Sequence, residues 1–98
     1  MKLIDYTKIL RSKNAGPLYI TFDLIFDDMD KMNYVLNNLK IKDVAKVYGV
    51  DEKHITVIPY AIVKSIKITF PRKYVSGSVF DDDVYGCQQH MPLANLEI

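Results

Sequence analysis

One run of strict alternation, from Leu18 to Phe26, most limits what this chain of 98 residues can fold into. Its even-numbered positions are all apolar: Leu18, Ile20, Phe22, Leu24 and Phe26. The positions between them are Tyr19, Thr21, Asp23 and Ile25. Because successive side chains of a β-strand point to opposite faces, the run predicts a strand whose apolar face lies on a core. On the other face, the carboxylate of Asp23 is either solvated or directed at something bound there.

Two helices are predicted after this strand. The first begins at Asp27-Asp28, because short acidic side chains accept hydrogen bonds from the free amides of a first helical turn. Its apolar stripe recurs at helical spacing: Met29, Met32, Val35, Leu36 and Leu39. The second helix follows Lys40 and ends at Gly49, which can adopt the left-handed cap conformation. Its apolar positions are Ile41, Val44, Ala45 and Tyr48.

The first residues are also predicted to be helical. Their apolar positions recur at spacings of three and four: Leu3, Tyr6, Ile9 and Leu10. Arg11 and Lys13 fall near the last turn, where cations interact favourably with the helix dipole. The helix is expected to end at Asn14-Ala15-Gly16-Pro17, because proline cannot continue it.

Two further strands are predicted in the second half of the chain. His54 to Ile58 is rich in β-branched residues and stops at Pro59. Ile62 to Phe70 alternates and ends before Pro71. Its predicted inward residues are Ile62, Ile66, Ile68 and Phe70. Its predicted outward residues are Ser65, Lys67 and Thr69.

These segments predict an α/β fold of the α+β kind. It is a two-layer sandwich in which a small mixed three-stranded sheet carries helices on one face and an ordered C-terminal tail. Residues 1–98 are expected to form a single domain, because the length and the 49% apolar content suit one core. The first two of these strands should run parallel if they are neighbours, and the last two should form a hairpin. Three apolar residues near the C-terminus are suited to covering an exposed edge: Leu93, Leu96 and Ile98.

The charge balance, the apolar runs and the motif content each exclude a class of function. Lys and Arg number 13 against 12 Asp and Glu, so the chain has no broad electrostatic footprint for nucleic acid. No apolar run approaches the length of a membrane helix, and no signal peptide is recognisable. The single cysteine, Cys87, fits a reducing compartment. We therefore expect a cytoplasmic protein with no nucleic-acid or membrane partner and, in the absence of phosphate-loop, CxxC or HExxH motifs, no cofactor.

The tail from Ser76 to Ile98 concentrates polar chemistry. Three carboxylates, Asp81 to Asp83, precede His90, and Gly86 lets the chain double back between them. A carboxylate that orients an imidazole is the usual arrangement for proton transfer, so His90 and Asp83 are the candidate catalytic residues. The same carboxylates also fit a solvated acidic turn. A metal is conceivable chemically, but the spacing is not diagnostic and no metal ligand is assigned.

Amides and cations supply the candidate substrate-binding residues. Gln88 and Gln89 offer donors and acceptors in two directions, which suits a carboxylate, a thioester carbonyl or the loop's own backbone. Arg11 and Asn14 form a second polar segment that favours an anion, although cations at a helix C-terminus are also expected from the dipole alone. Asp23 follows them along the chain and is expected to share their surface.

Five blocks along the chain carry a family resemblance: Arg11–Pro17, Thr21–Asp23, Tyr48–Val50, Ser76–Ser78 and Asp83–Leu93. They resemble a family of small domains of unknown function that accompany acyclic-terpene-utilisation A-type proteins. The most specific blocks are Asn14-Ala15-Gly16-Pro17 and Gln88-Gln89-His90. Members look like stand-alone proteins encoded beside the large protein, or like C-terminal extensions of it. The resemblance implies a small subunit of a two-component system in the catabolism of branched acids and coenzyme A thioesters.

Three functional hypotheses follow. The first is an accessory subunit that binds a large acyclic-terpene-utilisation-like protein and contributes its tail to a shared site for a small acid or thioester. The second is a stand-alone oligomeric lyase or hydratase in which His90 and an aspartate of Asp81 to Asp83 move protons. The third is a non-catalytic dimeric interaction module. A marginal core and open sheet edges favour assembly in each case, so a homo-oligomer is also expected.

Overall fold

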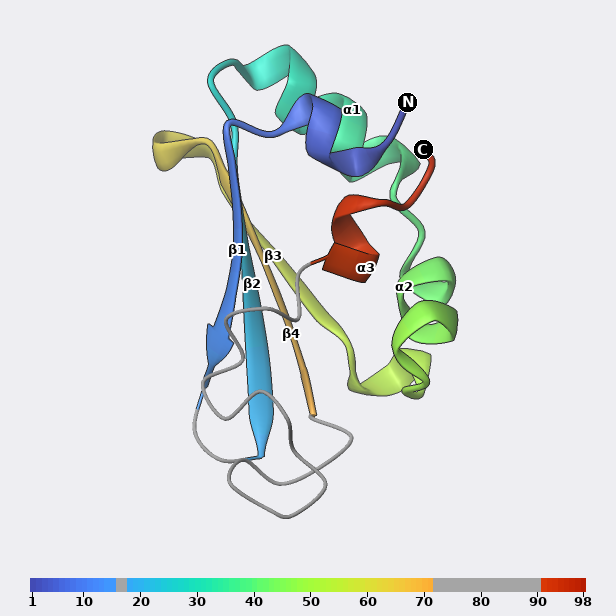
Figure 1. Ribbon diagram of the computed structural model, residues 1–98. Helices are drawn as coiled ribbons and strands as arrows, with labels where there is room; N and C mark the ends of the chain where they lie inside the picture. Colours follow the sequence, from blue (N-terminus) through green and yellow to red (C-terminus); the bar gives the residue numbers. More distant parts are fainter. Residues whose placement is uncertain (16–17, 72–90) are drawn as a thin grey trace.

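The structure, a computed structural model, describes residues 1–15, 18–71 and 91–98. A four-stranded antiparallel sheet in the order β1-β2-β4-β3 carries helices on one face (Figure 1). The strands are β1 (Ile9–Asn14), β2 (Tyr19–Ile25), β3 (Thr56–Tyr60) and β4 (Ser65–Pro71). The α-helices are α1 (Met29–Asn38), α2 (Ile41–Tyr48) and α3 (Met91–Ala94). Three single 3₁₀ turns complete the fold: η1 (Leu3–Tyr6), η2 (Glu52–His54) and η3 (Ala61–Val63).

The strand predicted from the alternating run is confirmed as β2, which is a central strand of the sheet. Ile20, Phe22 and Leu24 of β2 are almost fully buried on the helical side of the sheet. They meet the inward residues of β4 in register, since Phe22 lies opposite Ile68 and Ile20 lies opposite Phe70. The rings of Phe22 and Phe70 stack with their centroids 5.3 Å apart. These two strands therefore form one wall of the core.

The predicted N-terminal helix is wrong beyond its first turn. Helical structure ends at Tyr6, and Ile9–Asn14 instead forms edge strand β1, paired antiparallel with β2. The helical spacing of the apolar residues was misleading here, because β1 lies at the edge of the sheet and contributes few apolar side chains to the core. Ser12 occupies an inward position opposite Phe22 and is nevertheless buried. Backbone pairing with β2 outweighs the local helical spacing.

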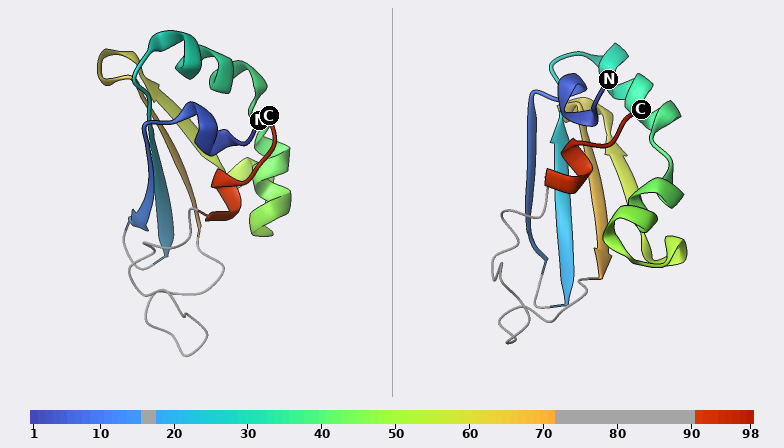
Figure 2. Two further views of the ribbon diagram at one scale, coloured as in Figure 1. Left: turned by 45° about the horizontal axis from the view of Figure 1, so that its top comes forward. Right: turned by 45° about the vertical axis from the view of Figure 1, so that its right-hand side comes forward.

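Both predicted middle helices are confirmed. Asp28 caps α1 and accepts a 2.8 Å hydrogen bond from the backbone N–H of Lys31. Gly49 ends α2 in the left-handed conformation, with φ of 67°. The two helices are separated only by Leu39 and Lys40, whose backbone is extended. In the turned views of Figure 2, α1 and α2 follow one another across the same face of the sheet.

The β3–β4 hairpin is confirmed, with two corrections at its boundaries. Pro59 does not stop β3 but lies within it, opposite Ile66, which an edge strand tolerates because an outward-facing N–H is not needed. Ile62 is not an inward strand residue. It belongs to η3 at the tip of the hairpin and its side chain is 99% exposed.

The topology corrects the predicted sheet. The sheet has four strands rather than three, and adjacent strands are antiparallel rather than mixed. β2 and β3 run in the same direction, but they are not neighbours because β4 lies between them. The helices between them therefore carry the chain past one strand position. The coarser α+β, two-layer prediction is confirmed.

The C-terminal residues pack on the helical face rather than covering an edge of the sheet. Leu93 is fully buried, and its backbone N–H donates a 3.0 Å hydrogen bond to the hydroxyl of Tyr48. The Tyr48 ring also packs against Phe22 and Phe70, with centroids 5.3 and 5.0 Å away. Burial raises the pKa of the Tyr48 hydroxyl above its usual value near 10. The predicted ordered tail between β4 and α3 lies outside the described residues.

The two ends of the chain lie side by side (Figures 1 and 2). Lys2 and Glu97 form an isolated antiparallel bridge, and the N–H of Ile98 donates a 3.1 Å hydrogen bond to the carbonyl of Met1. Leu3 is fully buried beneath this bridge region. Within the described ranges, no helix is long and apolar enough to cross a membrane.

Candidate functional site

The side of the sheet away from the helices carries a polar surface, which we call the outer face. Register and alternation assign its members, because paired residues in an antiparallel sheet project to the same side. None of the helices within the described ranges packs over this side (Figure 1). The outer-face residues of the two central strands are Tyr19, Thr21, Asp23, Ile25, Ser65, Lys67, Thr69 and Pro71. Those of the edge strands are Ile9, Arg11, Lys13, Thr56, Ile58 and Tyr60.

Arg11 and Asp23 form an ion pair near the middle of the outer face. They lie directly opposite one another on β1 and β2, with 3.6 Å between Nε of Arg11 and Oδ2 of Asp23. The Asp23 side chain is only 11% exposed, whereas that of Arg11 is 60% exposed. The carboxylate is therefore fixed in the sheet, while the guanidinium remains accessible and retains donors for a further acceptor.

Lys67 lies on the other side of Asp23. It is the partner of Asp23 across the β2–β4 ladder, and its ammonium group is 5.9 Å from the centroid of the Tyr60 ring. An ammonium group over a phenol ring is held by the ring quadrupole, which fixes it weakly. Next along the same strands, the hydroxyls of Thr21 and Thr69 are 3.2 Å apart. Asp23 is thus flanked by a cation on each neighbouring strand.

These residues line a shallow hollow of ≈ 340 Å³. Within the described ranges, its lining residues are Arg11, Lys13, Asp23, Ile25, Tyr60, Val63, Ser65 and Lys67. Among these described residues, three cations lie around one carboxylate, so this part of the lining carries an excess of positive charge. A planar guanidinium beside two flexible ammonium groups suits a carboxylate or phosphate, which they contact by charge-assisted hydrogen bonds.

The structure brings together only some of the candidate site residues. Arg11 and Asp23, predicted to share a surface, are in direct contact. Asn14 ends β1 in register with Ile20, which is a core-facing position of β2. Along β1, Asn14 therefore does not share the alternation of Arg11 and Lys13. The remaining candidates lie outside the described residues: Asp83, Gln88, Gln89 and His90.

Two contributors were not nominated from the sequence. Lys67 was placed on the outward side of its strand, but nothing in the sequence indicated that it pairs with Asp23. Tyr60 follows Pro59, where the predicted strand was expected to stop, but it belongs to β3 and its ring lies beneath the ammonium group of Lys67. The alternation of β4 contained the signal for Lys67. The strand order that brings it beside Asp23 is a tertiary property.

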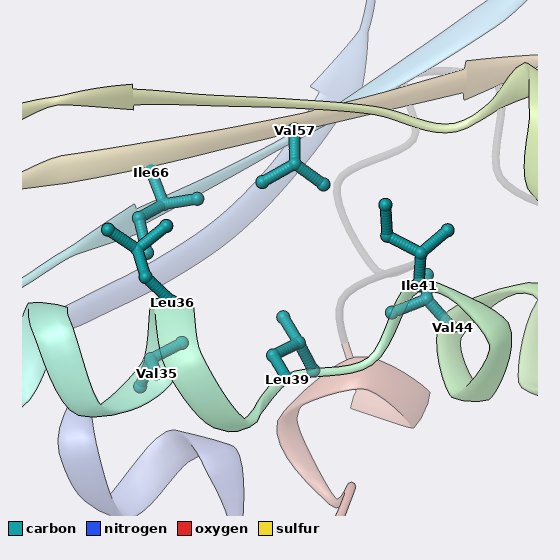
Figure 3. Close-up of a pocket in the computed structure, with 7 residues that line it drawn as sticks. All are labelled: Val35, Leu36, Leu39, Ile41, Val44, Val57 and Ile66. Atoms are coloured by element: carbon teal, nitrogen blue, oxygen red, sulfur yellow. The ribbon is translucent and has the colours of Figure 1, made fainter.

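A second, apolar pocket lies on the helical side of the sheet (Figure 3). It has a volume of ≈ 110 Å³ and lies between α1, α2 and the β3–β4 hairpin. The lining residues that the structure describes are all aliphatic: Val35, Leu36, Leu39, Ile41, Val44, Val57 and Ile66. The close-up shows their side chains around a common space. The sheet separates this pocket from the outer face.

The described residues contain no cluster of three or more histidine, cysteine, aspartate or glutamate side chains arranged to hold a metal ion. Asp23, the carboxylate among the described lining residues of the hollow, is paired with Arg11. The cations beside Asp23 are suited to contacting an anion.

Comparison with known proteins identifies the family of this chain. A family described as a domain of unknown function, DUF4387, matches residues 3–97. Neither the curated proteins nor the solved structures contain a match. The family match spans η1, the whole sheet, both longer helices and α3. The chain therefore belongs to the DUF4387 family of domains of unknown function.

Proposed function

We propose that the protein is a small accessory subunit that binds a large acyclic-terpene-utilisation-like protein and helps to hold a small branched acid or its coenzyme A thioester. The observation that carries this proposal is the outer face, where Arg11, Lys13 and Lys67 lie around the carboxylate of Asp23. The family resemblance of the Asn14-Ala15-Gly16-Pro17 block supports the identity of the partner. The two arguments are independent, because one concerns charge and the other concerns sequence.

The outer face suits an acidic partner surface. The helical face of the sheet is occupied by the core, whereas no helix of the described ranges packs over the outer face. Charged groups at an interface mainly set specificity and association rate. We therefore assign Lys67 and Lys13 to partner recognition, with Asp23 holding Arg11 in place.

Arg11 is the residue best placed to contact the anionic group of a ligand. Its side chain is 60% exposed, yet its Nε is held by a carboxylate that is nearly buried. A guanidinium positioned in this way can offer its remaining N–H groups to a carboxylate or phosphate. The ligand would then lie at the boundary between the outer face and the partner.

The experiment is a binding titration between the full chain and the large protein at two ionic strengths. Lys67→Glu should weaken the complex about tenfold or more at low salt, because like charges across an interface are strongly unfavourable. Lys53→Glu is the matched control, since Lys53 lies in η2 and is well exposed. Equal affinity for both variants, or no complex with the wild-type chain, would contradict the proposal.

The ligand part has its own test. Binding of 3-methylbutanoate and of its coenzyme A thioester to the assembled complex should weaken in Arg11→Gln, while assembly itself is retained. Unchanged ligand affinity in that variant would remove Arg11 from the proposed site. The alternative of a stand-alone lyase or hydratase depends on His90 and Asp83 and predicts turnover by the isolated chain that His90→Ala abolishes.

The tip of the β3–β4 hairpin favours self-association as a second candidate function. Ile62 is 99% exposed and its neighbour Val63 is largely exposed, so two aliphatic side chains project into solvent from one turn. Burying these two side chains against another molecule would be favourable, because it removes apolar surface from water. Sedimentation of wild type against Ile62→Asp tests the candidate. A concentration-dependent oligomer that the substitution dissociates supports it, and an identical distribution for both chains counts against it.

A further inference from the structure

The apolar pocket owes its existence to the break between two helices. Leu39 and Lys40 are extended, so the helical layer over the hairpin is interrupted at that point. Helices on either side cover the sheet, but the two-residue connection does not fill the space beneath it. The pocket lies there, between the end of α1, the start of α2 and the hairpin (Figure 3).

Burial along the lining is graded from floor to mouth. Val35, Val44 and Ile66 are at most 1% exposed and form the floor. Leu36, Leu39 and Val57 are half-buried around it, and Ile41 is 41% exposed. A sealed packing void would have uniformly buried walls. This gradient instead describes a pocket that opens to solvent beside Ile41.

We propose that this pocket binds a compact apolar group, either a small hydrocarbon or the hydrocarbon end of a small carboxylic acid. None of the lining side chains in the described part of the chain carries a hydrogen-bonding group, so a polar guest would lose its hydration without compensation. The volume of ≈ 110 Å³ approaches the ~150 Å³ of an engineered apolar cavity that binds benzene or xenon. A guest of that size would remove its own apolar surface and that of the lining from water, and it would make van der Waals contacts with the pocket on several sides.

The surroundings of the mouth accommodate an anionic end. Lys40 and Lys42 flank Ile41 in the chain and are both exposed. Their positive charge complements a carboxylate that remains in water while the attached alkyl group is inserted. The pocket is on the opposite side of the sheet from Arg11, so this proposal stands or fails separately from the proposed function.

The test is methyl NMR of the full chain titrated with xenon, benzene and 3-methylbutanoate. Saturable shifts are expected at the methyl groups of Val35, Leu36 and Leu39. No comparable shift is expected at Val47, which belongs to α2 but does not line the pocket. Saturation by benzene alone assigns a free apolar guest. Saturation by benzene and by 3-methylbutanoate, with the affinity for the acid lowered by salt, indicates that the guest is the hydrocarbon end of an anion.

Two matched substitutions complete the test. Val57→Phe fills the pocket and should abolish the saturable shifts, whereas Val47→Phe places the same ring elsewhere and should retain them. If the spectrum of Val57→Phe is not dispersed, that variant has not folded. Val44→Ile then serves as the filled variant, because it adds only one carbon at the floor of the pocket. Shifts that grow linearly with benzene, or that are equal in the filled and control variants, would overturn the proposal and leave a simple packing void.

Discussion

The hydroxyl of Tyr48 accepts a 3.0 Å hydrogen bond from the backbone N–H of Leu93 and so joins α2 to the C-terminal helix. This polar contact connects residues 45 positions apart in the chain and lies beside an aromatic cluster. It explains how a four-residue helix, too short to be stable alone, keeps a fixed place on the core.

Tyr48→Phe should lower the free energy of unfolding by about 1–3 kcal/mol near neutral pH, because the N–H of Leu93 loses its acceptor. The difference from wild type should shrink above pH 10. Burial raises the pKa of the folded-state hydroxyl above the unfolded value near 10, so the folded state keeps its proton where the unfolded state releases it. The stabilisation is complete below pH 10 and falls as the pH rises beyond it. Urea denaturation between pH 8 and pH 11 measures both effects, and a gap that widens with pH would refute the assignment.

Leu93→Ala should destabilise the protein by about 2–5 kcal/mol, since its fully buried side chain leaves a cavity. Leu18→Ala is the matched control, because Leu18 is 54% exposed and should change stability by no more than about 0.5 kcal/mol. Thermal melts followed by circular dichroism distinguish the two. Equal midpoints would mean that α3 does not contribute to the core.

Gly49→Ala should cost about 1–2 kcal/mol through backbone strain alone. Gly49 has φ of 67°, and a Cβ placed there meets no atom within 4 Å, so steric crowding does not contribute. Gly49→Asn should cost less, because asparagine adopts the left-handed conformation more readily. The measurement is urea denaturation of the two variants side by side. A larger loss for asparagine than for alanine would show that some other contact dominates at this cap.

Asp23→Asn should destabilise the isolated chain by about 1 kcal/mol or less at low salt, because Arg11 loses its partner among neighbouring cations. The loss should shrink at 1 M salt, where the Debye length falls to about 3 Å. Asp27→Asn removes the exposed i,i+4 pair with Lys31 and should cost only about 0.3–0.5 kcal/mol. A salt-independent loss at Asp23 would indicate a packing role instead of an electrostatic one.

The sequence predicted the elements whose patterns are local. The alternation around Phe22 and the helical stripe that includes Met32 each identified a buried face, and Asp28 and Gly49 marked real helix ends. These signals succeed because one face of each element is packed against the core. Their periodicity follows directly from that burial.

The sequence did not predict β1 or the position of Ile62. An edge strand gains its stability from the backbone of its neighbour, so β1 needs no alternating side chains and its few apolar residues resembled a helix. Ile62 continued the alternation of β4, but the hairpin turns there and leaves it in solvent. The proximity of Arg11 and Asp23 was expected for the wrong reason, since they meet across a strand pair rather than between a helix end and a strand.

The pairing of Lys2 with Glu97 has a practical consequence for protein engineering. Because the chain ends leave the fold at the same place, a few flexible residues would join them without disturbing the sheet, and new ends opened at Ile62 would fall on a fully exposed turn. Such a circular permutant would keep every strand pairing while reversing the order in which the two halves are synthesised.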